Sequence, residues 1–136
     1  MNPISPEGLI EQATIARERA QAHYSHFKVG AAIETADGRT ISGCNIENAS
    51  LGLTVCAERV ALWKALSDGF TSFKAIAVVT DAKTPARPCG ACRQLLWEYC
   101  GDIPVILHSL SGATEITSTA ELLPQPFDRR DLLLDR

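Results

Sequence analysis

The sequence lacks any long hydrophobic run, because no apolar stretch reaches the ~20 residues that a membrane-spanning helix needs. Its first residues, MNPISPEGLIEQ, also lack the basic start and apolar block of a secretory signal. We therefore expect a cytoplasmic protein with no membrane partner. Five cysteines without a secretory signal indicate a reducing compartment, where clustered thiols bind metal or do chemistry more often than they form disulfides.

An excess of positive charge is missing as well. The chain has 13 Lys and Arg against 16 Asp and Glu, which gives a formal net charge of −3. Proteins that bind nucleic acid through its phosphates rely on Lys and Arg to neutralise them, so this balance argues against such a partner and favours a small neutral ligand. At 136 residues the chain fits a single domain spanning residues 1–136, with one core and no linker.

Apolar periodicity and turn residues predict an alternation of helices and strands along the chain. The strand, helix, strand order in the second half implies a parallel pair joined by a crossover. Together the elements predict an α/β fold, a three-layer α/β/α sandwich with a mixed β-sheet. The expected elements are a helix over 5–22, a hairpin of strands 27–35 and 39–46 that turns at Asp37-Gly38, a buried helix over 56–66, a buried strand over 74–80, a helix over 89–99, a strand over 104–109, and then a short strand, a short helix stopped by Pro124 and a tail.

Three of the five cysteines form a pattern with chemical meaning. Cys89 and Cys92 make a CxxC at the start of an expected helix, a spacing that turns both sulfurs toward one point. Alone, this pair also fits a thioredoxin-like redox site, although such motifs usually follow the first strand of their fold. Cys56 opens the other buried helix with Glu58 two residues later, and a ligand, any residue and Glu followed by PCxxC is the signature of zinc deaminases.

Each residue type in this pattern has a chemical reason. Three thiolates on one Zn²⁺ leave the fourth tetrahedral position open for water, as in catalytic zinc sites. They also leave a net charge near −1, which the positive ends of the two helices and hydrogen bonds from Arg59 would offset. Glu58 would carry protons between water and substrate, so we expect its pKa to be raised in a dry pocket.

Simpler interpretations of the same residues remain open at this point. The zinc site would be structural if a histidine supplied a fourth ligand, but His23, His26 and His108 do not lie at ligand spacing from a cysteine. Glu58 would be structural if it formed a salt bridge with a nearby Lys or Arg. The remaining thiols, Cys44 and Cys100, are expected to pack as small apolar groups.

With CAER and PCGACRQ, the chain closely resembles the small, homotetrameric class of cytidine deaminases. The likeness extends to YSHFKVGAAI (24–33), GCNIENAS (43–50) and ELLPQPF (121–127), so it covers nearly the whole chain after the first helix. It implies the cytidine deaminase fold, one Zn²⁺ per chain and a homotetramer. The implied reaction is hydrolytic deamination of cytidine and 2′-deoxycytidine in pyrimidine salvage.

The resemblance also implies a role for individual residues. Zinc would be held by Cys56, Cys89 and Cys92, Glu58 would be the catalytic proton carrier, and Arg59 would temper the charge of the thiolates. Six residues would meet the substrate. The main-chain groups of Ala57 and Cys89 would meet the base and the leaving ammonia, and Phe27 would pack against the pyrimidine ring. Asn45 and Glu47 would bind the ribose hydroxyls, and Phe127 would reach the active site of a neighbouring subunit.

Two departures from the family pattern affect the expected substrate range. His23 replaces a proline that usually precedes the Tyr-Ser-x-Phe stretch, and Leu51 replaces an aromatic residue that commonly follows Asn-Ala-Ser. Both segments line or border the pocket in the family, so a deaminase of N4-substituted or otherwise modified cytosine nucleosides is the alternative. A blasticidin S deaminase, a deaminase of RNA or DNA, and a non-enzymatic zinc module fit the sequence less well.

Overall fold

The computed structural model describes residues 5–132 of the chain. Five strands form one mixed sheet in the order β2-β1-β3-β4-β5, in which only β3 and β4 run parallel. Within the described residues no helix is long and apolar enough to cross a bilayer. The elements are α1 (Pro6–Arg17), β1 (Gly30–Thr35), β2 (Thr40–Cys44), η1 (Leu51–Leu53), α2 (Ala57–Ser67), β3 (Phe73–Thr80), α3 (Gly90–Cys100), β4 (Pro104–Ser109), β5 (Thr114–Ser118), α4 (Thr119–Leu122) and α5 (Arg129–Leu132).

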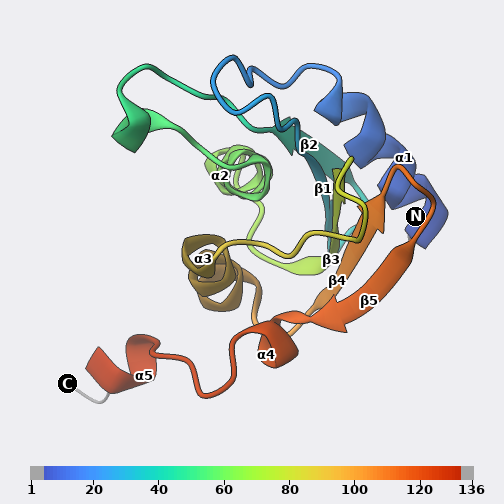
Figure 1. Ribbon diagram of the computed structural model, residues 1–136. Helices are drawn as coiled ribbons and strands as arrows, with labels where there is room; N and C mark the ends of the chain where they lie inside the picture. Colours follow the sequence, from blue (N-terminus) through green and yellow to red (C-terminus); the bar gives the residue numbers. More distant parts are fainter. Residues whose placement is uncertain (1–4, 133–136) are drawn as a thin grey trace.

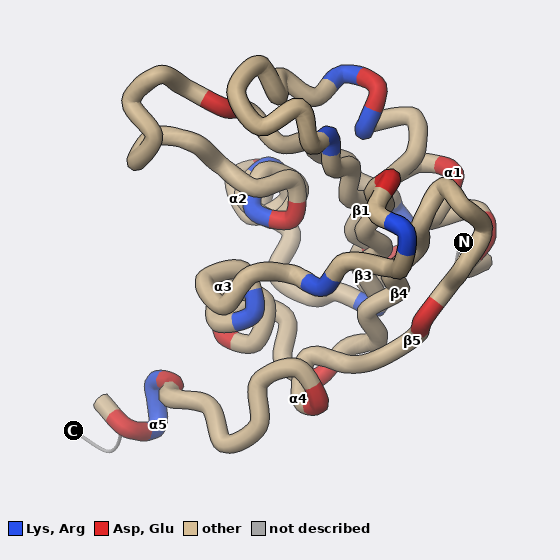
Figure 2. Tube along the Cα trace, viewed as in Figure 1, with Lys and Arg blue, Asp and Glu red and all other residues tan. Residues whose placement is uncertain are grey.

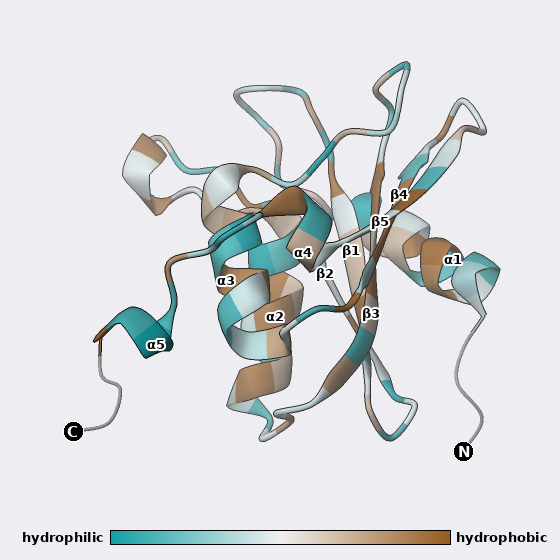
Figure 3. Ribbon diagram, turned by 90° about the horizontal axis from the view of Figure 1, so that it is seen from below, coloured by the Kyte–Doolittle hydropathy of each residue, from teal (hydrophilic) through white to brown (hydrophobic). Residues whose placement is uncertain are grey.

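The sheet separates two helical layers, as Figure 1 shows, with α1 on one face and α2 and α3 side by side on the other. Successive side chains of a strand point to opposite faces, so Ala31 and Ile33 of β1 join the larger core under α2 and α3, whereas Ala32 joins the smaller core under α1. Figure 3 shows hydrophobic residues along β3 and on α2, between the layers. The predicted three-layer α/β/α sandwich is confirmed.

Two glycines let the helices approach the sheet closely. A Cβ on Gly30 of β1 would lie 1.9 Å from the carbonyl oxygen of Ala13 in α1. A Cβ on Gly43 of β2 would lie 2.6 Å from the backbone nitrogen of Ala61 in α2. Because the two glycines make contact with opposite layers, they set the separation of both helices from the sheet.

The first helix is shorter than predicted, because the sequence pattern placed its end at residue 22. It ends at Arg17, after which the backbone of Gln21 forms a bridge with Ile46 beyond β2. The N–H of Gln21 donates to the carbonyl of Asn45 at 3.0 Å, and the N–H of Glu47 donates to the carbonyl of Gln21 at 2.8 Å. A pairing with residues more than twenty positions away therefore takes over the backbone groups that a longer helix would use.

The hairpin turns at Asp37-Gly38 as predicted, but its first strand begins at Gly30 rather than at Phe27. The side chain of Asn45 takes the place of a neighbouring strand over this stretch. Its Oδ1 accepts from the N–H of Val29 at 2.8 Å, and its Nδ2 donates to the carbonyl of Phe27 at 2.8 Å. The backbone is therefore satisfied without forming a β-ladder.

The C-terminal region holds one helix more than the sequence predicts. The short strand and the helix α4 before Pro124 are found as expected, but α5 follows where only a tail was predicted. Asp128 accepts from the N–H of Arg130, and Asp131 accepts from the N–H of Asp128, so the two carboxylates cap this last turn reciprocally. The apolar run of the tail is described only at Leu132, because positions 133 and 134 lie outside the described residues.

Candidate functional site

The two helices beyond the sheet begin next to each other, and each is preceded by a cysteine. Cys56 is the N-cap residue of α2 and Cys89 that of α3, and neither side chain makes a capping hydrogen bond. The sulfur atoms of Cys56 and Cys89 are 3.9 Å apart, and all three sulfurs, including that of Cys92 in the first turn of α3, lie within 4.8 Å of one another. The cysteines predicted to form one cluster do so.

The chemistry of this donor set fits Zn²⁺. Hydrogen bonds from Cys92 and Cys89 lower the pKa of Cys56 to about 6, whereas the pKa of Cys92 is raised because its thiol donates to Cys56 and is buried. Three sulfurs this close therefore cannot all be ionised unless a cation compensates their charge, and soft thiolates select zinc among the common divalent ions. The site can bind one zinc ion per chain.

No fourth protein ligand joins the cluster among residues 5–132. None of the three histidines belongs to it, and two of them are engaged elsewhere: His108 hydrogen-bonds with Thr114, and His23 with Gln21. A structural zinc site normally has four protein ligands, so three ligands are typical of a catalytic site that leaves a position open. This argues against the structural zinc interpretation.

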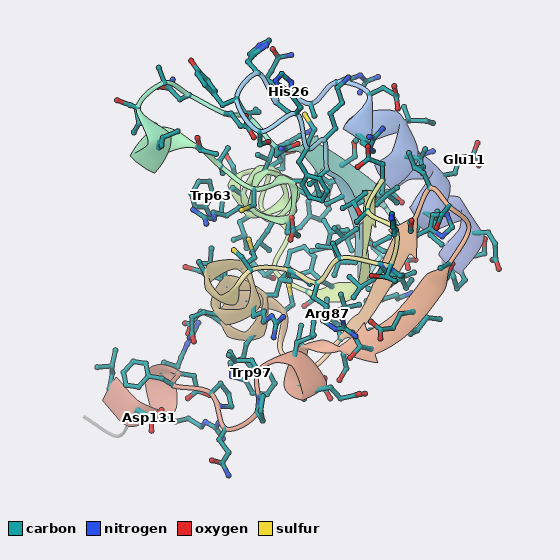
Figure 4. All side chains as sticks on the ribbon, viewed as in Figure 1. Glu11, His26, Trp63, Arg87, Trp97 and Asp131 are labelled. Atoms are coloured by element: carbon teal, nitrogen blue, oxygen red, sulfur yellow. The ribbon has the colours of Figure 1, made fainter. Side chains whose placement is uncertain are left out.

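Arg59 lies beside the sulfurs, as the sequence predicts. Burial opposes the charge of its guanidinium, but a hydrogen bond with Cys92 and the charges of the sulfurs raise the pKa of Arg59 overall. The guanidinium carbon also lies 5.8 Å from the ring centroid of Trp63, one turn further along α2, where Figure 4 shows the indole. A cation held on this side of the cluster reduces its negative charge.

Glu58 lies in the first turn of α2 and is buried, with 6 % of its surface exposed. Burial, with a smaller contribution from the nearby charge of Cys56, raises its pKa to about 7. No ion pair of Glu58 occurs within the part of the chain that the structure describes, so the salt-bridge interpretation is not supported. A carboxyl group with a pKa near neutrality can both accept and donate a proton.

Cys56, Glu58 and Cys89 line a cavity of about 300 Å³, a volume at the small end of the range for small-molecule sites. Of the residues that the sequence predicts for the site, Arg59, Cys92 and Phe127 do not line this cavity. Predominantly apolar walls with a few polar groups suit a flat, partly polar ligand. The lining residues are Ser25, Phe27, Val29, Asn45, Glu47, Thr54, Val55, Cys56, Ala57, Glu58, Val78, Thr80, Ala86, Arg87 and Cys89.

Asn45 and Glu47 line the same cavity, but much of their hydrogen-bonding capacity is used within the protein. Asn45 binds the backbone of Phe27 and Val29, as described above. The carboxylate of Glu47 accepts from the N–H groups of Tyr24 and Ser25 at 2.9 and 3.0 Å and from the hydroxyl of Ser25. The Ser25 hydroxyl is the main cause that lowers the pKa of Glu47, which favours an ionised acceptor in the cavity wall.

The sequence interpretation missed four polar residues of the cavity, Ser25, Thr54, Thr80 and Arg87. Ser25 lies between Tyr24 and the strand expected from Phe27. Its place two residues before Phe27 is the only feature of the local sequence that indicates a position in the cavity wall. Arg87 lies in the loop before Cys89 and forms an ion pair of 2.7 Å with Glu115 of β5; Figure 4 shows its side chain. No spacing rule links Arg87 to a partner 28 positions away.

The remaining predicted residues lie at the periphery. Phe127 is 59 % exposed, and its carbonyl accepts a hydrogen bond from Gln94 of α3 at 2.6 Å. Leu51 is 72 % exposed in η1, and His23 is exposed. None of the three lines the cavity within this single chain.

Known proteins are similar to this chain over nearly its whole length. The family model of the cytidine and deoxycytidylate deaminase zinc-binding region matches residues 4–107. The cytidine deaminase of Sporosarcina psychrophila is 52% identical over 127 residues, 93% of this chain and 93% of that protein, and that of Halalkalibacterium halodurans is 52% identical over 125 residues, 91% and 95%.

The crystal structure of cytidine deaminase from Burkholderia pseudomallei is also similar, with a TM-score of 0.88 and 49% sequence identity over 91% of this chain and 100% of that one. The span matched by the family model contains both helix starts that carry the sulfurs and Glu58. The sequence, the fold and the metal-binding groups thus agree, and the chain belongs to the cytidine and deoxycytidylate deaminase family.

Proposed function

We propose that the protein catalyses the hydrolytic deamination of cytidine and 2′-deoxycytidine, consuming water and releasing uridine or 2′-deoxyuridine and ammonia. The observation that carries this proposal is the buried carboxyl of Glu58 in a cavity wall, beside three clustered sulfurs of which those of Cys56 and Cys89 belong to residues that line the cavity. A proton carrier next to an open metal position is what hydrolytic removal of an aromatic amine requires. The names of the relatives described above agree with it.

Binding of the base is assigned to the apolar wall and to the helix starts. Phe27 packs against the pyrimidine ring, since its exposed ring borders the cavity. The main chain of Ala57 and Cys89 lies at the helix N-termini, where N–H groups without an intrahelical partner are available to ring and exocyclic atoms. Asn45 and Glu47 keep part of their hydrogen-bonding capacity free for the sugar. An amide and a carboxylate suit a hydroxyl, which both accepts and donates hydrogen bonds.

Proton transfer is assigned to Glu58. When bound by Cys56, Cys89 and Cys92, zinc supplies the Lewis acidity that activates water at neutral pH. Glu58 would accept one proton of the attacking water and deliver it to N3 of the cytosine ring. It would then accept the second proton from the hydroxyl that the water has left on C4 and deliver it to the amine, which leaves as ammonia when the C4–N4 bond breaks. Its pKa of about 7 suits both directions of transfer, and its burial keeps bulk water away from the proton that it holds.

We further propose that the active form is a homotetramer in the cytoplasm, working in pyrimidine salvage. Several large apolar side chains are exposed on a single chain, among them Leu51, Trp63 and Phe127, and contact with other subunits would cover them. Phe127 would then reach the cavity of a neighbouring subunit. A site built on three free thiols also suits a reducing compartment.

A single strand of RNA or DNA is not the proposed substrate. Figure 2 shows positive and negative residues interspersed along the trace, with no continuous basic track over residues 5–132. The net charge of −3 gives no electrostatic attraction for a polyanion. A free nucleoside fits a cavity of about 300 Å³.

The test is an ultraviolet absorbance assay of metal-quantified protein with cytidine, 2′-deoxycytidine, cytosine and an N4-substituted cytidine in parallel. Conversion of both nucleosides, with about one zinc per chain, is the expected result. Reaction of the N4-substituted compound alone would favour the alternative substrate class and direct attention to His23 and Leu51. Bound zinc without turnover of any compound would overturn the nucleoside assignment.

A further inference from the structure

The segment before β1 makes a tight turn that is built around the hydroxyl of Ser25. The N–H of His26 donates to the carbonyl of Ala22 at 3.0 Å, and His26 adopts a left-handed conformation with φ of 58°. This turn lets the N–H of Phe27 donate to Oγ of Ser25 at 3.0 Å. The same hydroxyl donates to Oε2 of Glu47, so Ser25 connects the backbone of the aromatic wall residue to the carboxylate.

The acceptor positions of Glu47 can be counted. An ionised carboxylate offers about four of them, two on each oxygen. The N–H groups of Tyr24 and Ser25 occupy both positions of Oε1, and the hydroxyl of Ser25 occupies one position of Oε2. One position on Oε2 is left for a donor from a ligand.

The three donors affect the orientation of the Glu47 carboxylate in different ways. Both N–H groups meet Oε1, so they anchor one end of the carboxylate and leave its plane free to turn about that end. The hydroxyl of Ser25 meets the other oxygen and therefore fixes the plane. Because Ser25 and Glu47 both line the cavity, fixing that plane also fixes the direction in which the remaining acceptor position lies.

We propose that Ser25 is a positioning residue for the substrate, whose hydroxyl orients Oε2 of Glu47 toward a hydroxyl of the nucleoside sugar. The inference rests on the proposed function, and it extends that function to a residue which does not itself take part in proton transfer. Ser25 acts through Glu47, so its loss affects recognition of the sugar and leaves the chemistry at the base unchanged.

The test compares Ser25→Ala with the unchanged protein on two substrates, cytidine and 2′,3′-dideoxycytidine, which lacks the sugar hydroxyls that Glu47 would bind. We expect KM for cytidine to rise about tenfold, which is the size for a lost hydrogen bond to a charged group. We expect kcat and zinc content to stay within about twofold, and KM for the dideoxy compound to stay unchanged. Ser25→Thr, which keeps the hydroxyl, restores the KM for cytidine.

A matched control is available in the β1–β2 hairpin. There the hydroxyl of Thr35 donates to the carboxylate of Asp37, the same chemistry away from the cavity, so Thr35→Val should leave both KM values unchanged. In a Glu47→Gln background, Ser25→Ala should add no further increase in KM.

Two results would overturn the inference while the proposed function stands. KM rising equally for both substrates would show that Ser25 only shapes the loop, and an unchanged KM for cytidine would show that Glu47 does not need it. If the unchanged protein handles both substrates with equal KM, the sugar-binding role of Glu47 fails and the inference fails with it. Absence of turnover with every cytosine nucleoside would overturn the proposed function itself.

Discussion

Cys56 and Glu58 lie two residues apart at the start of α2, yet their surroundings shift them in opposite directions. Hydrogen bonds from neighbouring thiols lower the pKa of Cys56 to about 6, which favours the charged form that binds metal. Burial raises the pKa of Glu58 to about 7, which brings the acid and its conjugate base close to balance near neutral pH. One helix turn thus supplies a group suited to bind a metal ion and a group suited to accept and donate a proton.

Glu58→Gln should separate these two roles. The amide keeps the size of the side chain and leaves the sulfurs in place, so zinc content should stay near one per chain. Since an amide cannot carry protons in this range, turnover of cytidine should fall by at least about 10²–10⁴-fold. Metal quantification and the absorbance assay on the same preparation measure both quantities.

Two comparisons complete this prediction. Glu11→Gln, on α1 across the sheet from the cavity, as Figure 4 shows, should leave both zinc and turnover unchanged. Cys89→Ala should lose zinc as well as turnover, because two sulfurs hold the ion far more weakly than three. Full activity of Glu58→Gln would contradict the mechanism.

The sequence predicted the residues of the metal cluster better than those of the sugar side, for a physical reason. Ligand spacing is local: Cys89 and Cys92 come together within a single helix turn, and the signature places Glu58 beside Cys56. Asn45 was predicted only as a sugar-binding residue, whereas its amide also bonds to Phe27 and Val29. Contacts across 16 to 18 positions depend on the folded chain and leave no periodic pattern to detect.

At the scale of the elements, the sequence predicted the central part of each helix and strand better than the residues at which it begins and ends. Apolar runs identified β3 and α2, because elements that pack in the core need nonpolar residues at many positions. The expectation that α2 is mostly buried was wrong, since Trp63 and Lys64 are exposed on its outer face. The end of α1 at Arg17 and the start of β1 at Gly30 depend instead on pairing with the segment after β2. Such pairings compete with local propensity and are decided by tertiary structure.

Gly30→Ala tests how tightly α1 is packed on the sheet. A Cβ would lie 1.9 Å from the carbonyl oxygen of Ala13 and 2.6 Å from the backbone nitrogen of Arg17, so the helix must move outward. The free energy of unfolding should fall by about 1–3 kcal/mol or more, measured by urea denaturation. Gly52→Ala is the matched control, because no atom lies within 4 Å of its added Cβ, and equal effects of the two substitutions would refute close packing.

The contact between α5 and α3 should depend on pH through Asp128. Hydrogen bonds from Arg130 and from the indole of Trp97 hold the pKa of Asp128 well below its ordinary range. A lowered pKa contributes stability above the unfolded-state value of about 3.9, and this contribution is lost as the pH falls further. Asp128→Asn should therefore lower the free energy of unfolding at pH 7 and at pH 5.

The difference between Asp128→Asn and the wild-type protein should shrink below about pH 4, because the unfolded wild-type chain then binds a proton at Asp128 that the folded protein, with its lowered pKa, does not bind. Urea denaturation followed by circular dichroism at pH 7, 5 and 3 measures it. A difference of constant size across this range would mean that the charge of Asp128 does not stabilise the contact.

On the scale of the whole molecule, a single chain leaves much apolar surface uncovered beyond the sheet. The helix side of the molecule carries exposed side chains from η1, α2 and the C-terminal segment. Scattered exposed residues are ordinary, but several on one side indicate an interface. The large ones are Leu51, Leu53, Trp63, Phe127 and Leu132.

We propose that Phe127 connects this surface to activity. Its backbone is held by Gln94 while its ring is 59 % exposed and lies outside the cavity of its own chain, so the ring is available to a second copy. If it completes a neighbouring site, Phe127→Ala should raise KM for cytidine about tenfold or more, in keeping with the loss of a buried aromatic contact. Ile116→Ala on β5, where the side chain is 63 % exposed, serves as a control and should change KM little.

Sedimentation velocity at micromolar concentration, run on the samples used for kinetics, separates the two ways in which Phe127→Ala can act. A tetramer that retains its mass but loses affinity for cytidine would mean that the ring contacts the substrate or its pocket. A variant that dissociates and loses affinity together would mean that the ring holds subunits whose sites depend on one another. If the wild-type protein sediments as a fully active monomer, the shared site is contradicted, because every residue needed for turnover then comes from one chain.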